Sequence, residues 1–306
     1  MKIQNSVQTL TGSLSPEKPE LAFRDAMQAS FGRLDWLPVP DGEIHRFRVP
    51  EDKPGTQNGW YVLYLDGIAS GAFGSWKAGG SQSWSSRKPS DPFEADLIRQ
   101  RTEQARRLRE AEQHQRQQTA AIKAQRLWCT SAPADTSHAY LTRKGCQAHK
   151  LRQQGELLLV PLYRDRVLVN LQRIALDGSK RFLPGGRVKG CYSPIGVLAA
   201  DAPLYLCEGW ATGATIHEHN GVAVACAMNA GNLLEVGRQL QQQYPQNPLI
   251  VAGDDDRQTE GNPGRAAANH AAALLGCSVV FPPWSGNEPL SLSDFNDLRQ
   301  WWEVNP

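Results

Sequence analysis

Hydrophobic residues in the last hundred positions of the chain alternate between short strand-like runs and longer segments with helical periodicity. The strand-like runs are 203–207, 221–227, 248–253 and 277–282, and the helical segments between them are 211–219, 233–244 and 265–275. Strands that alternate with helices are typical of a mostly parallel sheet with right-handed crossover connections. We therefore predict an α/β domain over residues 201–306, within a chain that is α+β overall.

The first 88 residues show a different pattern. After a polar leader with a short helix near 19–30, residues 41–86 alternate aromatic or β-branched residues with polar ones, and Asp66-Gly67 is a hairpin signal. This pattern predicts a small antiparallel β module. Its aromatic rings and cations could stack on single-stranded nucleic acid, but packing in the module's own core is the favoured interpretation. The residues concerned are Trp60, Tyr61, Trp76, Trp84, Arg46, Arg48 and Lys77.

Residues 89–128 are almost free of Gly and Pro and rich in Arg, Gln, Glu and Ala. This composition predicts one long charged connector helix, and its apolar positions are too sparse for a coiled-coil seam. Charge runs on helices are usually solvated faces, so contact with a nucleic-acid backbone is the less favoured role of its arginines. These are Arg99, Arg101, Arg106, Arg107 and Arg109.

Residues 129–200 are predicted to form a basic region that precedes the α/β domain. A short helix ends at Gly145, and two antiparallel strands follow with their turn near Arg164-Asp165. The next stretch, SKRFLPGGRVKG, places four cations within ten residues among several glycines, which favours a loop that approaches phosphates. The cations are Lys180, Arg181, Arg187 and Lys189.

Carboxylates follow two of the predicted parallel strands. Glu208 follows LYLC, and Asp254 and Asp256 follow LIVAG. If these strands are neighbours, the acids meet at the edge where open α/β sheets bind ligands. Grouped carboxylates repel one another unless a cation lies between them, and Mg²⁺ prefers oxygen ligands and phosphates, which points to phosphoryl or nucleotidyl transfer. The alternatives are a helix cap for Glu208 and an ordinary acidic turn for 254–256.

A second anion site is suggested where Pro263 and Gly264 begin a helix whose first amides could face a phosphate. Composition adds little to this picture, because a net charge of +2 is too small to indicate a nucleic-acid partner. The six cysteines contain no CxxC pair, which argues against a zinc ribbon and against a disulfide framework. No signal peptide or membrane-length apolar run is present, so we expect a cytoplasmic protein without a membrane partner.

A strand ending in Glu-Gly followed by a strand ending in Asp-x-Asp resembles the Toprim domain of bacterial-type primases, topoisomerases and some nucleases. The stretches HAYLTRKG, ELLLVPLYRDRVLVNLQRIALDG, GNPGRAAANHAAALLG and DFNDL are similar to the Toprim primases of phages, plasmids and integrated elements. The resemblance covers residues 135–306 well and residues 41–86 more loosely. It identifies residues 201–306 as a Toprim catalytic domain.

This resemblance implies an RNA polymerase that makes short RNA primers on single-stranded DNA from NTPs, with a separate replicative helicase as a further partner. The implied cofactor is Mg²⁺, with Mn²⁺ as the alternative and no zinc. The implied catalytic and metal-binding acids are Glu208, Asp254 and Asp256, with Asp294 and Asp297 as further metal ligands and Lys180, Arg181, Arg187 and Lys189 as template or NTP ligands. A Toprim nuclease and a non-catalytic nucleic-acid-binding module remain the alternatives.

Overall fold

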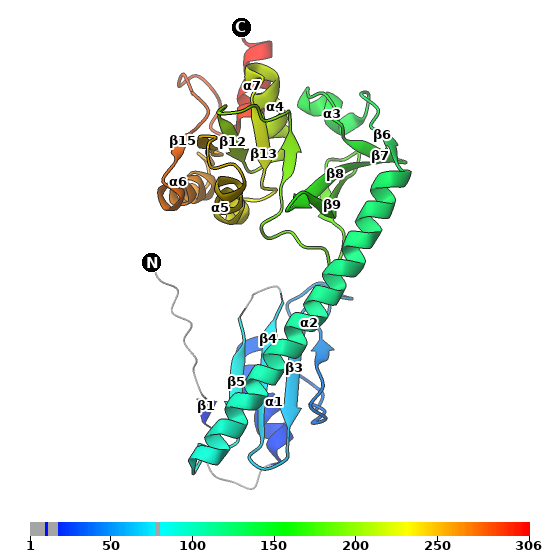
Figure 1. Ribbon diagram of the computed structural model, residues 1–306, viewed down its shortest axis with the longest axis vertical. Coiled ribbons are helices and arrows are strands. Elements are labelled where there is room, and N and C mark those ends of the chain that lie inside the picture. Colours follow the sequence, from blue (N-terminus) through cyan, green and yellow to red (C-terminus); the bar gives the residue numbers. More distant parts are fainter. Residues whose placement is uncertain (1–9, 12–17, 77–79) are drawn as a thin grey trace. The chain divides into compact units, whose positions relative to one another are not determined.

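The computed structural model describes residues 10–11, 18–76 and 80–306, and the chain divides into two compact units, Met1–His114 and Gln115–Pro306 (Figure 1). Each unit is described by itself below. Lys77, one of the cations predicted beside the aromatic residues of the β module, lies outside the described residues.

The first unit contains a five-stranded sheet of order β1-β5-β4-β3-β2. Its strands are β1 (Leu10–Thr11), β2 (His45–Phe47), β3 (Gly59–Tyr64), β4 (Ser70–Ser75) and β5 (Gln82–Ser85). All neighbours are antiparallel except β1 and β5. The predicted hairpin is confirmed, because Asp66-Gly67 lies between β3 and β4 and Gly67 adopts a φ of 67° that favours glycine.

Two helices cover the two faces of this sheet. Phe23 and Met27 of α1 (Pro19–Phe31) pack in the same core as Tyr61 and Leu63 of β3. The alternate residues of β3, including Trp60, pack with Ala105 of α2 (Pro92–Thr130). Because successive side chains of a strand point to opposite faces, the two helices lie on opposite sides of the sheet.

The aromatic residues of the β module form its core, as the favoured interpretation predicted. Trp60, Tyr61 and Trp84 are 2%, 3% and 4% exposed, so their rings cannot stack on a nucleic acid. Trp76 is half-buried, and the guanidinium groups of Arg46 and Arg109 lie over its ring. The stacking role is therefore wrong for the three buried rings.

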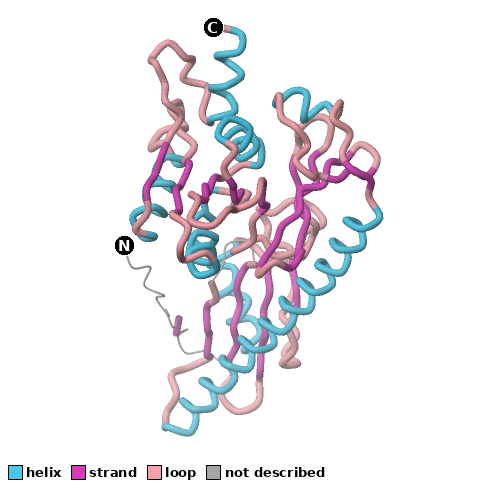
Figure 2. The backbone as a smooth tube through the Cα atoms, turned by 45° about the horizontal axis from the view of Figure 1, so that its top comes forward, coloured by secondary structure: helices cyan, strands magenta, loops and turns pink. Residues whose placement is uncertain are grey.

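The predicted connector helix is confirmed as the 39-residue helix α2, which Figure 2 shows as one continuous helix. Its arginines in the first unit have partners there. Arg101 is buried and contacts Asp66 and Ser70, and Arg106 and Arg107 are paired with Glu103. The favoured interpretation of a charged solvated face therefore holds for Arg106 and Arg107, and Arg101 instead anchors α2 to the sheet.

The second unit begins with an antiparallel sheet of order β10-β9-β8-β7-β6. Its strands are β6 (Ala132–Pro133), β7 (Arg152–Gln154), β8 (Leu157–Arg164), β9 (Val167–Ile174) and β10 (Lys180–Phe182). Strands β8 and β9 form the predicted hairpin, with Asp165 and Arg166 at its turn. One face packs on Ala124 of α2, and the other shares a core with the short helix α3 (Ala139–Lys144).

The predicted α/β domain is confirmed as a sheet of order β11-β13-β12-β14-β15, in which only β11 is antiparallel to its neighbour. Its strands are β11 (Ser193–Ile195), β12 (Leu204–Cys207), β13 (Ala223–Cys226), β14 (Leu249–Ala252) and β15 (Ser278–Val280). Its helices are α4 (Trp210–Asn220), the 3-10 turn η1 (Ala230–Asn232), α5 (Leu233–Gln243), α6 (Pro263–Leu275) and α7 (Phe295–Val304). Alternate side chains of β12 point into two different cores, one shared with α4 and the other with α5 and α6.

No helix in the described part of the chain is long and apolar enough to cross a membrane.

Candidate functional site at the carboxyl edge of the parallel sheet

The predicted acids lie at one edge of the sheet because β12 and β14 are direct parallel neighbours. Cys207, the last residue of β12, is in register with Ala252, the last residue of β14. Glu208 follows the first of these residues, and Asp254 follows the second after one glycine. The sequence prediction that the two strands are adjacent and present their acids together is therefore confirmed.

Asp254 is the most perturbed acid of this edge. Its Oδ1 atom is buried and accepts no hydrogen bond. Burial, followed by repulsion from Asp294, Glu208 and Asp256, raises the pKa of the Asp254 carboxyl to about 8. A buried carboxylate oxygen that has no hydrogen-bond partner and lies among other acids is stabilised by a bound cation.

Glu208 is held by the loop that follows β13. The pKa of the Glu208 carboxyl is raised, mainly by burial and further by repulsion from Asp256. A hydrogen bond that the carboxylate accepts from the backbone N–H of Ala230 opposes this effect in part. Met228 in the same loop has a φ of 71°, which is unusual for a residue with a side chain and marks strain at a functional edge. The alternative of Glu208 as the cap of α4 does not hold, because Gly209 occupies the cap position and the Glu208 carboxylate accepts from Ala230 instead.

The three consecutive aspartates have different surroundings. Asp255 is 4% exposed, and its carboxylate accepts hydrogen bonds from Asn262 at 2.6 Å and Trp284 at 2.9 Å and pairs with Arg265. These contacts lower the pKa of Asp255 even though burial opposes them. Asp255 therefore anchors the turn, which explains why a catalytic role fits its two neighbours better.

Asp256 interacts with the beginning of α6. Its Oδ2 atom accepts the backbone N–H of Gly264 at 2.8 Å, and the N–H of Arg265 donates to the side chain of Asn262. The prediction that these amides face a phosphate is therefore wrong, because the protein's own side chains already accept from them. Gly264 also approaches the acids closely, since a Cβ there would lie 3.0 Å from the Asp254 carbonyl oxygen.

Asp294 and Asp297 belong to the beginning of α7. Asp294 caps the helix, with Oδ1 accepting the N–H of Asp297 at 2.8 Å and Oδ2 accepting the hydroxyl of Thr212 at 3.1 Å. Asp297 accepts the N–H of Ser293 and pairs with Lys144 at 3.3 Å. Burial raises the pKa of Asp294, and the negative charge of Asp294 raises the pKa of Asp254. All four carboxylate oxygens thus have partners within the protein.

The carboxylates at this edge are candidate ligands for a divalent cation. Within the described ranges, no three His, Cys, Asp or Glu side chains form a group that could hold a metal ion. The observation that favours a cation is instead the unpartnered buried Oδ1 atom of Asp254, since such an atom lacks only a positive partner. Carboxylate oxygens are the type of ligand that Mg²⁺ prefers, so the chemistry of these donors, although not a preformed cluster, fits the ion.

The four predicted cations do not converge on the acids. Lys180 and Arg181 lie on strand β10 and not in a flexible loop, which corrects the sequence prediction. Desolvation of the Lys180 ammonium, followed by repulsion from Lys144, lowers the pKa of this surface lysine, whereas Asp294, Glu208 and Asp254 favour its charged form. Arg181 is opposite Arg173 across the strand pair, and successive side chains of β10 point to opposite faces.

The other two predicted cations lie in the loop before β11, which is tied to the sheet. The side chain of Arg187 donates to the carbonyl of Lys189. Burial raises the pKa of the Cys191 thiol, and the positive charge of Arg187 opposes this effect. Asn232 is 3% exposed and fixes this loop by accepting the N–H of Gly190 and donating to the carbonyls of Val188, Cys191 and Ala227.

Sequence reasoning missed Lys144 and Asn232. Lys144 is the last residue of α3, and its ammonium pairs with Asp297. Its positive charge also lowers the pKa of Lys180, so Lys144 is a second basic side chain beside the acids. The stretch HAYLTRKG contained it, but a single lysine before a helix-ending glycine gives no signal of its own. Asn232 follows a strand end, where a buried asparagine cannot be distinguished from a turn residue.

Comparison with known proteins places this edge in a family. Residues 203–301 match the family described as Toprim domain. The chain is 35% identical over 265 residues to a DNA primase TraC of Escherichia coli, covering 82% of this chain and 25% of that protein. A second DNA primase TraC of Escherichia coli is 34% identical over 258 residues, covering 80% and 18%. The chain thus spans a quarter or less of the length of these curated relatives.

A solved structure of the Aquifex aeolicus primase, with its zinc-binding and RNA polymerase domains, is also similar. The match covers 94% of this chain and 85% of that one, at 13% identity and a TM-score of 0.40. The family assignment rests on the sequence matches, which include the strands that carry Glu208, Asp254 and Asp256. Residues 203–301 therefore form a Toprim domain, and the resemblance of the chain to the Toprim DNA primases is confirmed.

Proposed function

We propose that this chain is a primase-type RNA polymerase that synthesises short RNA primers on single-stranded DNA by metal-dependent nucleotidyl transfer from NTPs. The similarity to two DNA primases supports the reaction class. The observation that carries the proposal is the buried, unpartnered carboxylate oxygen of Asp254, beside Glu208 at the shared edge of β12 and β14. Nucleotidyl transfer requires an edge that binds a metal ion, next to basic side chains that bind a triphosphate.

In this reaction the 3′-oxygen of one nucleotide attacks the α-phosphorus of the next, and pyrophosphate leaves. Asp254 and Asp256 would hold Mg²⁺, or Mn²⁺ in its place, with Glu208 as a further ligand or as the general base. When bound, such an ion would neutralise charge on the phosphates and lower the pKa of the 3′-hydroxyl. Burial raises the pKa of Glu208 toward the range in which a carboxylate accepts a proton effectively. Asp294 and Asp297 are assigned to a further metal position.

Two lysines beside the acids are assigned to the NTP. Lys180 and Lys144 interact electrostatically with each other, and an anion between them would relieve their repulsion. We assign the triphosphate to this pair. We assign Arg181, Arg187 and Lys189 to the phosphates of the template strand.

The proposed division of the chain follows from these assignments. Residues 201–306 form the catalytic domain and 129–200 its basic part, with the connector at 89–128 and the β module at 1–88. The partners are single-stranded DNA, NTPs and a separate replicative helicase, in the cytoplasm.

The test incubates the full chain with single-stranded DNA, labelled NTPs and Mg²⁺, and separates the products on a gel. We expect short RNA, uncut DNA, and loss of RNA with Asp254→Ala or Glu208→Gln. Asp201→Asn is the matched control, because Asp201 is an exposed acid that precedes β12 at its other end. Shortened DNA that appears without NTPs would identify a nuclease instead, and DNA binding without either product would identify a binding module.

A further inference from the structure

Helix α7 binds the end of helix α3 through side chains on one face. The C-terminal carbonyls of a helix have no partners within the helix, and those at the end of α3 accept hydrogen bonds from side chains of α7 spaced three and four apart. Gln300 donates to the carbonyl of Arg143 at 2.8 Å, Asn296 to that of Lys144 at 2.8 Å, and Arg299 to those of Lys144 and Gly145 at 2.7 and 2.8 Å. The last turn of α3 is therefore fixed by a neighbouring helix.

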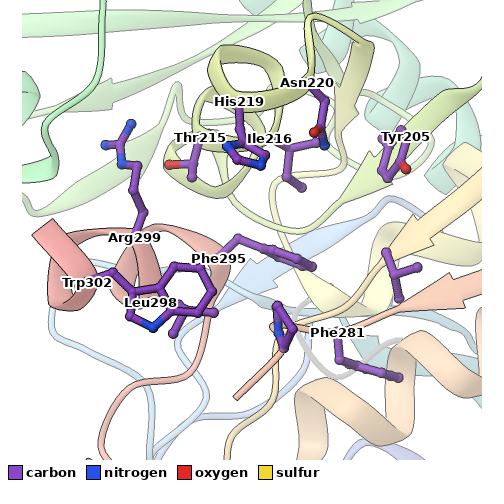
Figure 3. A pocket seen from close by; sticks show the side chains of 12 residues that line it. Tyr205, Thr215, Ile216, His219, Asn220, Phe281, Phe295, Leu298, Arg299 and Trp302 are labelled. Carbon is purple, nitrogen blue, oxygen red and sulfur yellow. The ribbon is translucent and has the colours of Figure 1, made fainter. Parts of the chain in front are cut away.

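Arg299 is the central residue of this contact. One nitrogen, Nη2, donates to the two α3 carbonyls, while Nη1 pairs with the Glu218 carboxylate of α4 at 2.8 Å. The other Glu218 oxygen contacts His149 at 2.6 Å, so the carboxylate is itself fixed. Figure 3 shows Arg299 extending from α7 near Thr215 of α4, at the margin of a 340 Å³ cavity. A planar guanidinium held on two edges has little freedom to turn.

The position of Lys144 depends on this arrangement. Its backbone carbonyl is held by Arg299 and Asn296, and its ammonium pairs with Asp297 of the same helix α7 at 3.3 Å. Lys144 also lies near the like charge of Lys180, which would drive a loosely held lysine away. Helix α7 therefore fixes both ends of Lys144 against a repulsive neighbour.

We propose that Arg299 is a positioning residue, which holds the Lys144 ammonium beside the carboxylate edge so that it meets the triphosphate of the incoming NTP. This role rests on the proposed function. Arg299 itself contacts neither the acids of the edge nor Lys180 through any interaction described above; it acts through the backbone of α3.

The first test measures the position of Lys144 without any need for activity. The full chain and its Arg299→Met variant are treated with an amine-acetylating reagent, and modification is followed by peptide mass spectrometry. We expect acetylation of Lys144 to accelerate roughly two- to five-fold, the factor that corresponds to losing an ion pair of this exposure. Lys150, an exposed lysine, is the internal reference and should not change. Gln300→Leu removes only the contact to Arg143 and is the matched control.

An unchanged rate at Lys144 in Arg299→Met would refute the proposal, whether or not the protein makes RNA. If Arg299→Met does not fold, Arg299→Lys replaces it, because a lysine keeps the charge beside Glu218 but lacks the planar fork that reaches two carbonyls. The same acceleration is expected in that variant.

The second test is a double-mutant cycle in primer synthesis. Arg299→Met should lower kcat/KM for NTP roughly ten-fold, with unchanged affinity for single-stranded DNA, since small displacements of a positioning group are costly. Because Arg299 acts through Lys144, the double variant with Lys144→Met should be no worse than Lys144→Met alone. Losses that multiply would overturn the proposal. Absence of RNA from the wild-type protein would instead overturn the proposed function, and the acetylation result would still decide where Arg299 places Lys144.

Discussion

Replacing Asp254 by Asn is expected to stabilise the metal-free protein, although it abolishes the proposed activity. The Asp254 carboxyl has a pKa of about 8, against an ordinary value of 3.8, because of burial and neighbouring acids. A raised folded-state pKa means that ionisation opposes folding. The stability of the wild-type protein without metal should therefore fall as pH rises from about 4 to about 8, and the loss should be complete above pH 8.

The size of the effect follows from the same shift. At pH 7 the full difference corresponds to about 4 kcal/mol, since each pH unit between 3.8 and 7 contributes about 1.4 kcal/mol. The repulsion is shared among several acids and is screened by water at an open edge, so we expect about half of that value, or roughly 2 kcal/mol. Asparagine has nearly the same shape and carries no charge, which removes this cost.

The assay is urea unfolding followed by tryptophan fluorescence between pH 5 and 9, in EDTA and in Mg²⁺. Asp254→Asn should have a higher midpoint than the wild type in EDTA at pH 7, and Mg²⁺ should stabilise only the wild type. The adjacent Asp255→Asn is the matched control with the opposite sign. The pKa of Asp255 is lowered, so its contribution is present at neutral pH and is lost on acidification, and this variant should lose roughly 2–3 kcal/mol. A destabilised Asp254→Asn in EDTA would refute the reasoning.

Three further predictions concern the residues around this edge. Lys180→Met should weaken NTP binding without changing the salt dependence of DNA binding. Arg181→Met should instead reduce the slope of log DNA affinity against log salt concentration by about one, as fluorescence anisotropy over a salt series would show. The reverse pattern would exchange the two assignments. Asn232→Leu removes three hydrogen bonds to the loop before β11 and one to Ala227 after β13, and it leaves buried backbone groups unpaired, so we expect a loss of roughly 3 kcal/mol in urea unfolding; a loss below 1 kcal/mol would contradict this account. Gly264→Ala should lower primer synthesis more than stability, because its Cβ would lie 2.8 Å from the Asp256 Oδ2 atom and would displace that carboxylate; equal activity in both proteins would show that the acid tolerates displacement.

Sequence patterns predicted the architecture of the second unit because its strands and helices have strong periodicity and clear breaks. The adjacency of β12 and β14, and with it the meeting of Glu208 and Asp254, followed from general rules for parallel sheets. The distinction between Asp254, Asp255 and Asp256 could not be predicted. It depends on Asn262, Trp284 and Arg265, which reach Asp255 from α6 and from the segment after β15.

The basic segment shows why the rest could not be predicted. Four cations within ten residues suggested one phosphate-binding loop, but charge density says nothing about which side chains share a face. Lys180 and Arg181 lie on a strand, so they point in opposite directions, and Lys180 is the one that interacts with Glu208, Asp254 and Asp294. The partner of Lys180 in that place, Lys144, comes from a helix 36 positions earlier, and only tertiary packing on α7 brings it there.

The position of α7 in the chain has a consequence for biosynthesis. Every strand of the parallel sheet precedes this helix in sequence, so the sheet can form on the ribosome before α7 has been translated. Until then Lys144 lacks Asp297 as its ion-pair partner, and the last carbonyls of α3 lack the donors of Asn296 and Arg299. A nascent chain could therefore display Glu208 and Asp254 without the fixed cation beside them. The carboxylate edge is therefore complete only after α7, the last of its elements in sequence, has been translated.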